Sequence, residues 1–201
     1  MRLIAAYLAI LVLAGCSGLL SKPTALPSAH SLDRAAVLTP VAPRLETAPT
    51  LIVNPPHAAA GFDSKHMVYS RQAHKLEYFA RHEWVDTPAR MLAPLMIAAI
   101  EASGAFRAVV LTPSAASGDM MLDTAIVHFA QDFSGTPSRL RVTLHAVLVD
   151  SATRRVLASR EFDVVVAAGS DGPEGGVVAA NRAVQDVLAQ LADFCAATVR
   201  Q

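Results

Sequence analysis

The sequence has few cysteines, few charges and few aromatic residues. Its 201 residues include two cysteines, Cys16 and Cys195, which excludes a disulfide framework and a four-cysteine zinc site. Charged residues make up 17% of the chain and are balanced, with Lys+Arg 17 and Asp+Glu 17, so the composition gives no basis for a nucleic-acid partner. Hydrophobic residues reach 53%, too many for a chain that is disordered throughout. These values predict one folded domain with a tail.

Motifs for nucleotide binding, metal binding and nucleophilic catalysis are also missing. The glycine-rich stretch 169–176 lacks the spacing and the Lys-Ser/Thr ending of a phosphate-binding loop, and we interpret it as a turn. His82-Glu83 begins like a zinc-protease motif, but Asp86 stands where the second histidine belongs. Ser170 lacks the first glycine of a nucleophile elbow. We therefore expect no catalytic residues, no metal and no cofactor, and predict that the protein is not an enzyme.

Two further groups of reactive side chains have a structural explanation. His128 and His145 could oppose each other across neighbouring strands, and such a pair without a third ligand is a poor zinc site. Cys195 follows the apolar pattern of the last expected helix. We expect it to be a small buried hydrophobic residue and not a reactive thiol.

The N-terminus has the features of an export signal. A short positive start is followed by the uncharged run 3–13, which is too short to span a bilayer because spanning needs about 20 residues. The tetrad Leu13-Ala14-Gly15-Cys16 resembles the bacterial lipobox, at which lipoproteins are cut and the cysteine receives lipid. An ordinary signal peptide or a membrane anchor that happens to contain a cysteine is the alternative. We predict a signal peptide over 1–15 and lipidation of Cys16.

Lipidation would fasten the chain to a membrane. Each buried methylene contributes about 0.8 kcal/mol, so several acyl chains hold a protein where one does not. Ser17, and not aspartate, follows the cysteine. By resemblance to sorted bacterial lipoproteins, this implies the periplasmic face of the outer membrane.

Residues 16–49 have the composition of a linker. Serine, proline and alanine dominate this segment, and no hydrophobic period persists. We interpret it as a tether between the lipid and the folded domain. The alternative is that part of it, such as 31–38, adds an edge strand.

Residues 50–201 carry the periodic patterns of a folded domain. Thr87-Pro88 predicts a helix start, and Gly104 suits the residue after its end. Residues 139–150 alternate between apolar and polar side chains, as a half-buried strand does. Further strands are expected at 51–53, 66–70, 76–79, 106–111, 119–133 and 156–166, and a second helix from about 176 to 199. This order predicts an α+β two-layer sandwich with a mainly antiparallel sheet and two helices packed on one face.

Aromatic residues are concentrated in one short stretch. Tyr69, Tyr78, Phe79 and Trp84 fall within sixteen residues, with basic side chains between them. They could form an amphipathic patch for a protein partner or a lipid, or they could fill the core between sheet and helices. We favour the core for Phe79 and Trp84 and leave both alternatives open for the tyrosines. Tyr69, Tyr78 and Trp84 are the candidate contact residues.

The order and spacing of several residues resemble the ABC-type transport auxiliary lipoproteins, which accompany lipid transporters with MCE (mammalian cell entry) domains. Besides Cys16, the resemblance rests on Tyr69, Leu76-Glu77-Tyr78-Phe79, Trp84, Leu92-x-Pro94-Leu95, Ser103-Gly104-x-Phe106, Leu122 and Asn181. It implies a small α+β periplasmic domain without a catalytic motif. It also implies docking to an MCE-domain protein and an ABC permease/ATPase complex, or help in passing a phospholipid or sterol between membranes. A structural or assembly lipoprotein of another envelope complex and a periplasmic hydrolase using Ser170 are the alternatives.

The lipobox leads to a direct prediction. Replacing Cys16→Ala removes the thiol that would carry the lipid, so the protein should leave the membrane fraction and appear in the soluble periplasmic fraction. Fractionation and immunoblotting of the two forms measure this. Unchanged membrane association of the variant would contradict the lipidation of Cys16.

Overall fold

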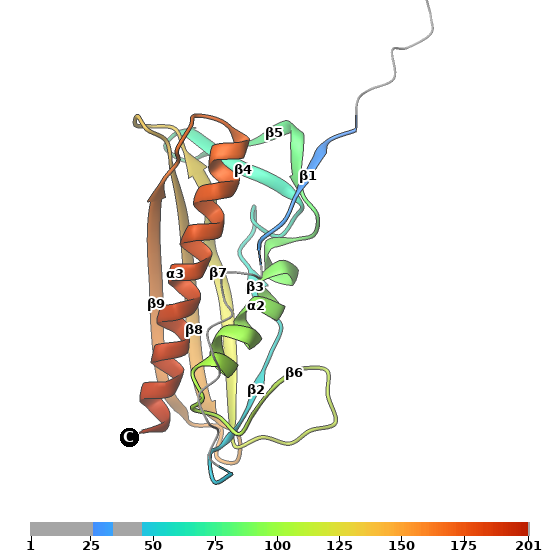
Figure 1. Cartoon of the computed structure of the whole chain (residues 1–201), viewed down its shortest axis with the longest axis vertical. Helices are drawn as coiled ribbons and strands as arrows, with labels where there is room; N and C mark the ends of the chain where they lie inside the picture. Colours follow the sequence, from blue (N-terminus) through green and yellow to red (C-terminus); the bar gives the residue numbers. More distant parts are fainter. Residues whose placement is uncertain (1–25, 34–45, 201) are drawn as a thin grey trace, which may run out of the picture.

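A computed structural model describes residues 26–33 and 46–200, so the predicted signal peptide and Cys16 lie outside the described residues. Within these residues, two helices cover a single sheet (Figure 1). The elements are β1 (Ser28–His30), β2 (Thr50–Val53), β3 (His57–Ala58), β4 (His66–Gln72), β5 (Lys75–Trp84), α2 (Pro88–Ala102), β6 (Ala108–Leu111), β7 (Met120–Asp132), β8 (Arg139–Asp150), β9 (Val156–Ala167) and α3 (Pro173–Val199).

Strand β7 is paired along both of its edges. On one edge it forms a long antiparallel ladder with β8, which in turn pairs with β9. On the other edge β2, β3 and β4 follow one another, all parallel to β7. Their register places Leu51 beside Met120, His57 beside Ala125 and Tyr69 beside Gln131. The chain from 50 to 70 therefore runs alongside a strand that comes much later in the sequence.

The predicted fold class is confirmed. The sheet is mixed: the long ladders of β7, β8 and β9 are antiparallel, whereas several short strands pair in parallel. Both helices lie on the same face of this sheet, with α3 over β8 and β9 and α2 beside α3 (Figure 1). The three successive strands joined by short turns were expected, and they form the meander β7–β8–β9.

The helix signals in the sequence have the expected structural consequences. Thr87 Oγ1 accepts a hydrogen bond from Arg90 N at 3.4 Å, and Pro88 is the first residue of α2. Gly104 follows the helix with φ of 67°, a conformation that glycine adopts without steric cost. None of the helices in residues 26–33 and 46–200 is both long and apolar enough to cross a membrane.

The core lies between the helices and the inner face of the meander. All five inward-facing residues of β8 are buried, as the alternation predicted: Leu140, Val142, Leu144, Ala146 and Leu148. They meet the apolar stripe of α3, in which Ala180, Val184, Val187 and Leu191 are buried. Cys195 is also buried in this core, as predicted, and burial raises the pKa of its thiol to about 12.

The N-terminal boundary of the domain differs from the prediction. Residues 28–30, placed in the tether by sequence, form β1, which runs parallel to the end of β5 with Ser28 beside His82. Val85 N donates to His30 O at 2.8 Å. The imidazoles of His30 and His82 also meet, with Nε2 and Nδ1 3.1 Å apart. The backbone hydrogen-bonding groups at this edge of β5 are thus paired with a strand that is too short to show a periodic pattern.

The residues that follow β1 also contact the rest of the domain. Leu32 is buried in the core, and Asp33 N donates to the Oδ1 atom of Asn181 on α3 at 2.6 Å. The folded part therefore begins before residue 50, and its first strand, at 28–30, lies before the segment 31–38 that was considered as an alternative edge strand. Asn181, one of the residues on which the family resemblance rests, thus fastens the N-terminal segment to α3.

A leucine-to-alanine substitution in the core should lower the free energy of unfolding much more than the same substitution at the surface. Leu144 is fully buried, so Leu144→Ala should lower the free energy of unfolding by about 2–5 kcal/mol. Leu157 on β9 is 37% exposed, and Leu157→Ala should cost less than about 1 kcal/mol. Urea denaturation followed by circular dichroism measures both values. Equal losses in the two variants would contradict the placement of the core.

Candidate functional site

A cluster of aromatic rings lies where β4, β5 and the end of β7 meet, at the upper end of the molecule in Figure 1. The ring centroids of Tyr69 and Phe79 are 4.5 Å apart, and Phe133 lies 5.7 Å from Tyr69 and 6.2 Å from Phe79. These three residues, called here the aromatic cluster, are each only partly buried. The Arg71 guanidinium lies over the Tyr69 ring at 5.1 Å. The cluster therefore presents apolar ring surface beside a positive charge.

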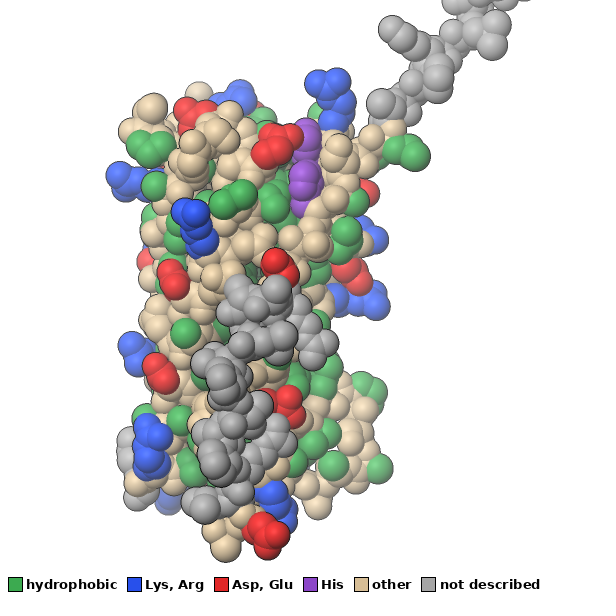
Figure 2. Space-filling model, viewed as in Figure 1, with side chains coloured by type: hydrophobic (Ala, Val, Ile, Leu, Met, Phe, Trp, Pro, Cys, Tyr) green, Lys and Arg blue, Asp and Glu red, His purple; other side chains and the backbone are tan. Residues whose placement is uncertain are grey.

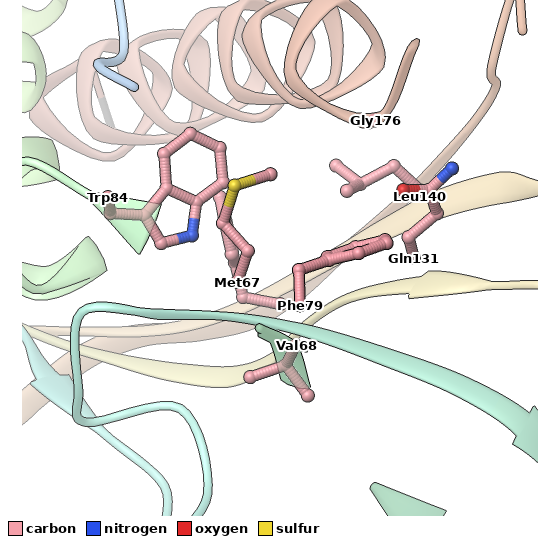
Figure 3. Close-up of a pocket in the computed structure, with 8 residues that line it drawn as sticks. Met67, Val68, Phe79, Trp84, Gln131, Leu140 and Gly176 are labelled. Atoms are coloured by element: carbon pink, nitrogen blue, oxygen red, sulfur yellow. The ribbon is translucent and has the colours of Figure 1, made fainter. Parts of the chain in front are cut away.

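A small cavity lies directly behind Phe79. Its volume is about 10 Å³, enough for roughly one water molecule. Figure 3 shows Trp84 and Met67 on one side of this space, and Leu140 and Gln131 on the other. The lining residues come from β4, β5, β7, β8 and the first turn of α3: Met67, Val68, Phe79, Trp84, Phe129, Gln131, Leu140 and Gly176. Most of the wall is thus apolar, and Phe79 belongs both to this wall and to the aromatic cluster.

Gln131 is the polar side chain in this wall. Its Nε2 atom donates a hydrogen bond to Ser138 Oγ at 2.9 Å. Its Oε1 atom is buried and has no hydrogen-bond partner within the described residues. Leaving a buried acceptor unpaired costs about 1–3 kcal/mol, so this atom stands out from the apolar surface around it.

Two glycines in the first turn of α3 make close contacts, and one of them, Gly176, lets this turn approach Gln131 Oε1. A Cβ atom on Gly176 would collide with Gln131 Oε1, and one on Gly175 would collide with the carbonyl oxygen of Ser170. The glycine-rich stretch 169–176, interpreted from sequence as a turn, ends inside α3, which begins at Pro173. Its last two glycines allow the start of this helix to pack closely against neighbouring atoms. Sequence reasoning missed both Gln131 and Gly176, because a glutamine in a strand and a glycine before a helix carry no functional signal by themselves.

The structure brings two of the three candidate contact residues to this end of the sheet. Trp84 is 2% exposed and forms part of the cavity wall, in agreement with the expected core role. Tyr69 belongs to the aromatic cluster. Tyr78 lies outside the cluster, is 47% exposed and packs against His66 with ring centroids 4.8 Å apart. Tyr78 is thus a surface residue, whereas Tyr69 packs against Phe79, and Trp84 lines the same cavity as Phe79.

The possible opposition of His128 and His145 does not occur. His128 lies beside Thr143, and His145 lies beside Ala125, so the register of the ladder places the two histidines at different positions along it. The described residues contain no group of three or more His, Cys, Asp or Glu side chains placed to hold a metal ion.

A charged network lies beside His128. Arg141 binds both carboxylate oxygens of Asp163, at 2.7 and 2.9 Å, and Thr143 Oγ1 donates to the same carboxylate at 2.7 Å. The hydrogen bond from Arg141 holds the pKa of Asp163 below its usual value. Burial, and next the charge of Arg141, lower the pKa of His128.

Charge is not concentrated on the visible face of the molecule. In Figure 2 acidic and basic side chains are scattered over this face, with hydrophobic side chains between them. A scattered arrangement does not form the basic stripe that binds nucleic acid.

Comparison with known proteins decides the family. No curated protein matches the chain. The family model of the ABC-type transport auxiliary lipoprotein component matches residues 30–192. The chain belongs to the ABC-type transport auxiliary lipoprotein family. This family is a class of auxiliary transport lipoproteins and not a class of enzymes, and its name indicates a bacterial envelope protein associated with an ABC transporter. The match begins at β1, consistent with the early start of the folded part.

Solved structures of other proteins share the fold of this chain. A Xanthomonas campestris protein assigned to the DUF330 family has a TM-score of 0.73 and 24% identity, with 88% of this chain and 95% of that chain covered. A second structure, of an uncharacterized protein, has a TM-score of 0.63 and 14% identity, with 87% and 99% covered. At these identities the likeness concerns the fold alone.

The lowered pKa of His128 predicts a pH dependence of stability. The unfolded chain takes up a proton at this position near the ordinary pKa of 6.5, whereas the folded chain takes it up only at lower pH. The free energy of unfolding should therefore fall as pH drops below about 6.5, and His128→Gln should reduce this loss. Urea denaturation between pH 7.5 and 5 measures the slope. His57→Gln on the exposed strand β3 is the control, and equal slopes in the His128 variant and the unchanged protein would contradict the prediction.

Proposed function

We propose that this protein is a periplasmic accessory lipoprotein, anchored at the outer membrane, of an MCE-type ABC lipid transport system. It docks to the transporter, assists lipid transfer between membranes, or does both. Membership of the auxiliary lipoprotein family carries this proposal, together with the lipobox at Cys16. The domain acts by contact with a protein partner, and no step of catalysis is assigned to it.

The anchor gives the domain a restricted working volume. Ten residue-to-residue steps lead from Cys16 to Leu26, so this part of the chain spans at most about 35 Å. A domain on so short a tether is confined to a thin layer above the membrane, which raises its effective concentration near a membrane-bound partner. The tether enters the fold at β1, which is paired with β5.

The β4–β5 end of the molecule is the proposed docking surface. It holds the partly exposed aromatic cluster, and the ring of Tyr78, which is 47% exposed, lies on the same strand β5 outside this cluster. Aromatic side chains supply much of the binding energy in protein interfaces, because each covers a large area at little cost in conformational entropy. This surface is on the same element, β5, that receives the anchored N-terminal strand, so the tether would hold it on the membrane side.

Site-specific crosslinking tests the docking surface. A photo-crosslinking amino acid at position 69 or 78 of the acylated protein should capture an MCE-domain protein in cells. The control is position 156 at the start of β9. Val156 pairs with Val149, at the end of the meander opposite to the part of β7 that pairs with β4, and is 56% exposed. We expect no capture from this control position.

Two outcomes would overturn the proposal. Repeated absence of any transporter component from positions 69 and 78 would exclude docking through this surface. Capture of components of a different envelope complex would instead support the alternative function, a structural or assembly lipoprotein.

A further inference from the structure

We propose that the cavity behind Phe79 is a binding site for the hydroxyl end of a neutral amphiphile, with Gln131 as its hydrogen-bonding partner. The ligand class is an uncharged alcohol with an apolar body. The site rests on the geometry of the cavity and not on the proposed docking, so the two proposals can fail separately.

The buried amide of Gln131 has an acceptor atom without a hydrogen-bond partner among the described residues. Gln131 is 1% exposed, and its Oε1 atom has no hydrogen-bond partner in residues 26–33 and 46–200. The Nε2 atom of the same amide is already used by Ser138. Because a buried acceptor without a partner is costly, a small polar group in the adjoining cavity would gain a hydrogen bond that the folded chain does not provide. The Oε1 atom has almost no accessible surface, so the amide would turn slightly toward the cavity to form this bond.

A hydroxyl group fits this partner better than a charged group. No Asp, Glu, Lys, Arg or His is among the residues that line the cavity in the described segments of the chain, so a buried charge would be uncompensated. A hydroxyl both donates and accepts, and it therefore satisfies Gln131 whichever way the amide is turned. An ammonium group only donates and a carboxylate only accepts, and each would enter at the cost of desolvation.

The shape of the site separates the polar end of the ligand from its body. A volume of about 10 Å³ takes one group of the size of water, so the hydroxyl and little else fits behind Phe79. The remainder of the ligand would lie on the aromatic cluster, whose rings are partly exposed next to Phe79. Met67, another residue of the wall, has a flexible side chain that adapts to different shapes.

Gly176 determines whether the cavity can be used. A methyl group at this position would collide with Gln131 Oε1, the atom that the ligand must reach. Position 169 is a matched control, because a Cβ atom there meets nothing within 4 Å. Gly176→Ala should therefore close the site, whereas Gly169→Ala should leave it open.

Trp84 provides the measurement. It is the one tryptophan in the sequence, and it lines the cavity. The experiment uses the chain from position 16 onward with the substitution Cys16→Ser. This form keeps every described residue and needs no detergent. We expect its tryptophan emission to change in a saturable way with 1-hexanol. Sodium hexanoate and hexylammonium chloride, which have the same chain length but carry charge, should give no saturable change.

The variants decide whether Gln131 is the partner. Gln131→Met keeps the length of the side chain and removes the amide, and it should raise the Kd for 1-hexanol at least about tenfold, the order expected when a buried hydrogen bond is lost. Gly176→Ala should abolish saturable binding and Gly169→Ala should retain it. Circular dichroism checks the fold, and Gln131→Met decides the question if Gly176→Ala does not fold.

Three results would overturn the proposal. They are a Kd unchanged by Gln131→Met, equal binding of hexanoate and hexanol, and crystals soaked in 1-hexanol in which the cavity holds a resident water only. Density for a hydroxyl next to Gln131 in such crystals would support it.

Discussion

Strand β7 is the constraint on which the rest of this structure depends, because it is paired on both edges. Its ladder with β8 fixes the meander, and the tandem strands β2, β3 and β4 on its other edge fix the course of the chain before α2. With both edges satisfied and one face covered by helices, its inner residues Leu122, Ile126 and Phe129 are almost fully buried. The core, the position of β4 and the place of Gln131 all follow from this arrangement.

Gln131 stands at the end of this strand, where the regular packing stops. There β4 pairs with β7, and the first turn of α3 comes close because position 176 is a glycine. Two strands and one helix therefore meet around one amide, and their side chains leave a small space between them. The aromatic cluster borders this space on the outside. The same end of the molecule thus combines a buried polar atom, a cavity and partly exposed rings, and the proposed amphiphile site rests on these three features.

Periodic patterns and end signals made much of the fold predictable. The alternation in 139–150 identified β8 and its inner face, and Thr87-Pro88 with Gly104 marked both ends of α2. Strand β1 could not be predicted, because three residues show no period and its pairing with β5 is purely tertiary. The resemblance to auxiliary lipoproteins, which rested on spacing and not on any single motif, is confirmed by the family match.

The candidate site was less predictable than the fold. The aromatic residues pointed to the stretch that contains Tyr69 and Trp84, and the core role expected for Trp84 agrees with its burial, but Tyr78 lies apart from Tyr69. Gln131 and Gly176 matter because of atoms that approach from other elements, and such information is absent from a local pattern.

The central claim is that a lipid on Cys16 holds this domain at a membrane, where it acts by contact. Mass spectrometry of the N-terminal peptide of the protein extracted from native membranes tests this most directly. The account predicts a mature chain that begins at Cys16 and carries fatty acyl groups. An unmodified terminus on a protein recovered from the soluble periplasm would contradict it.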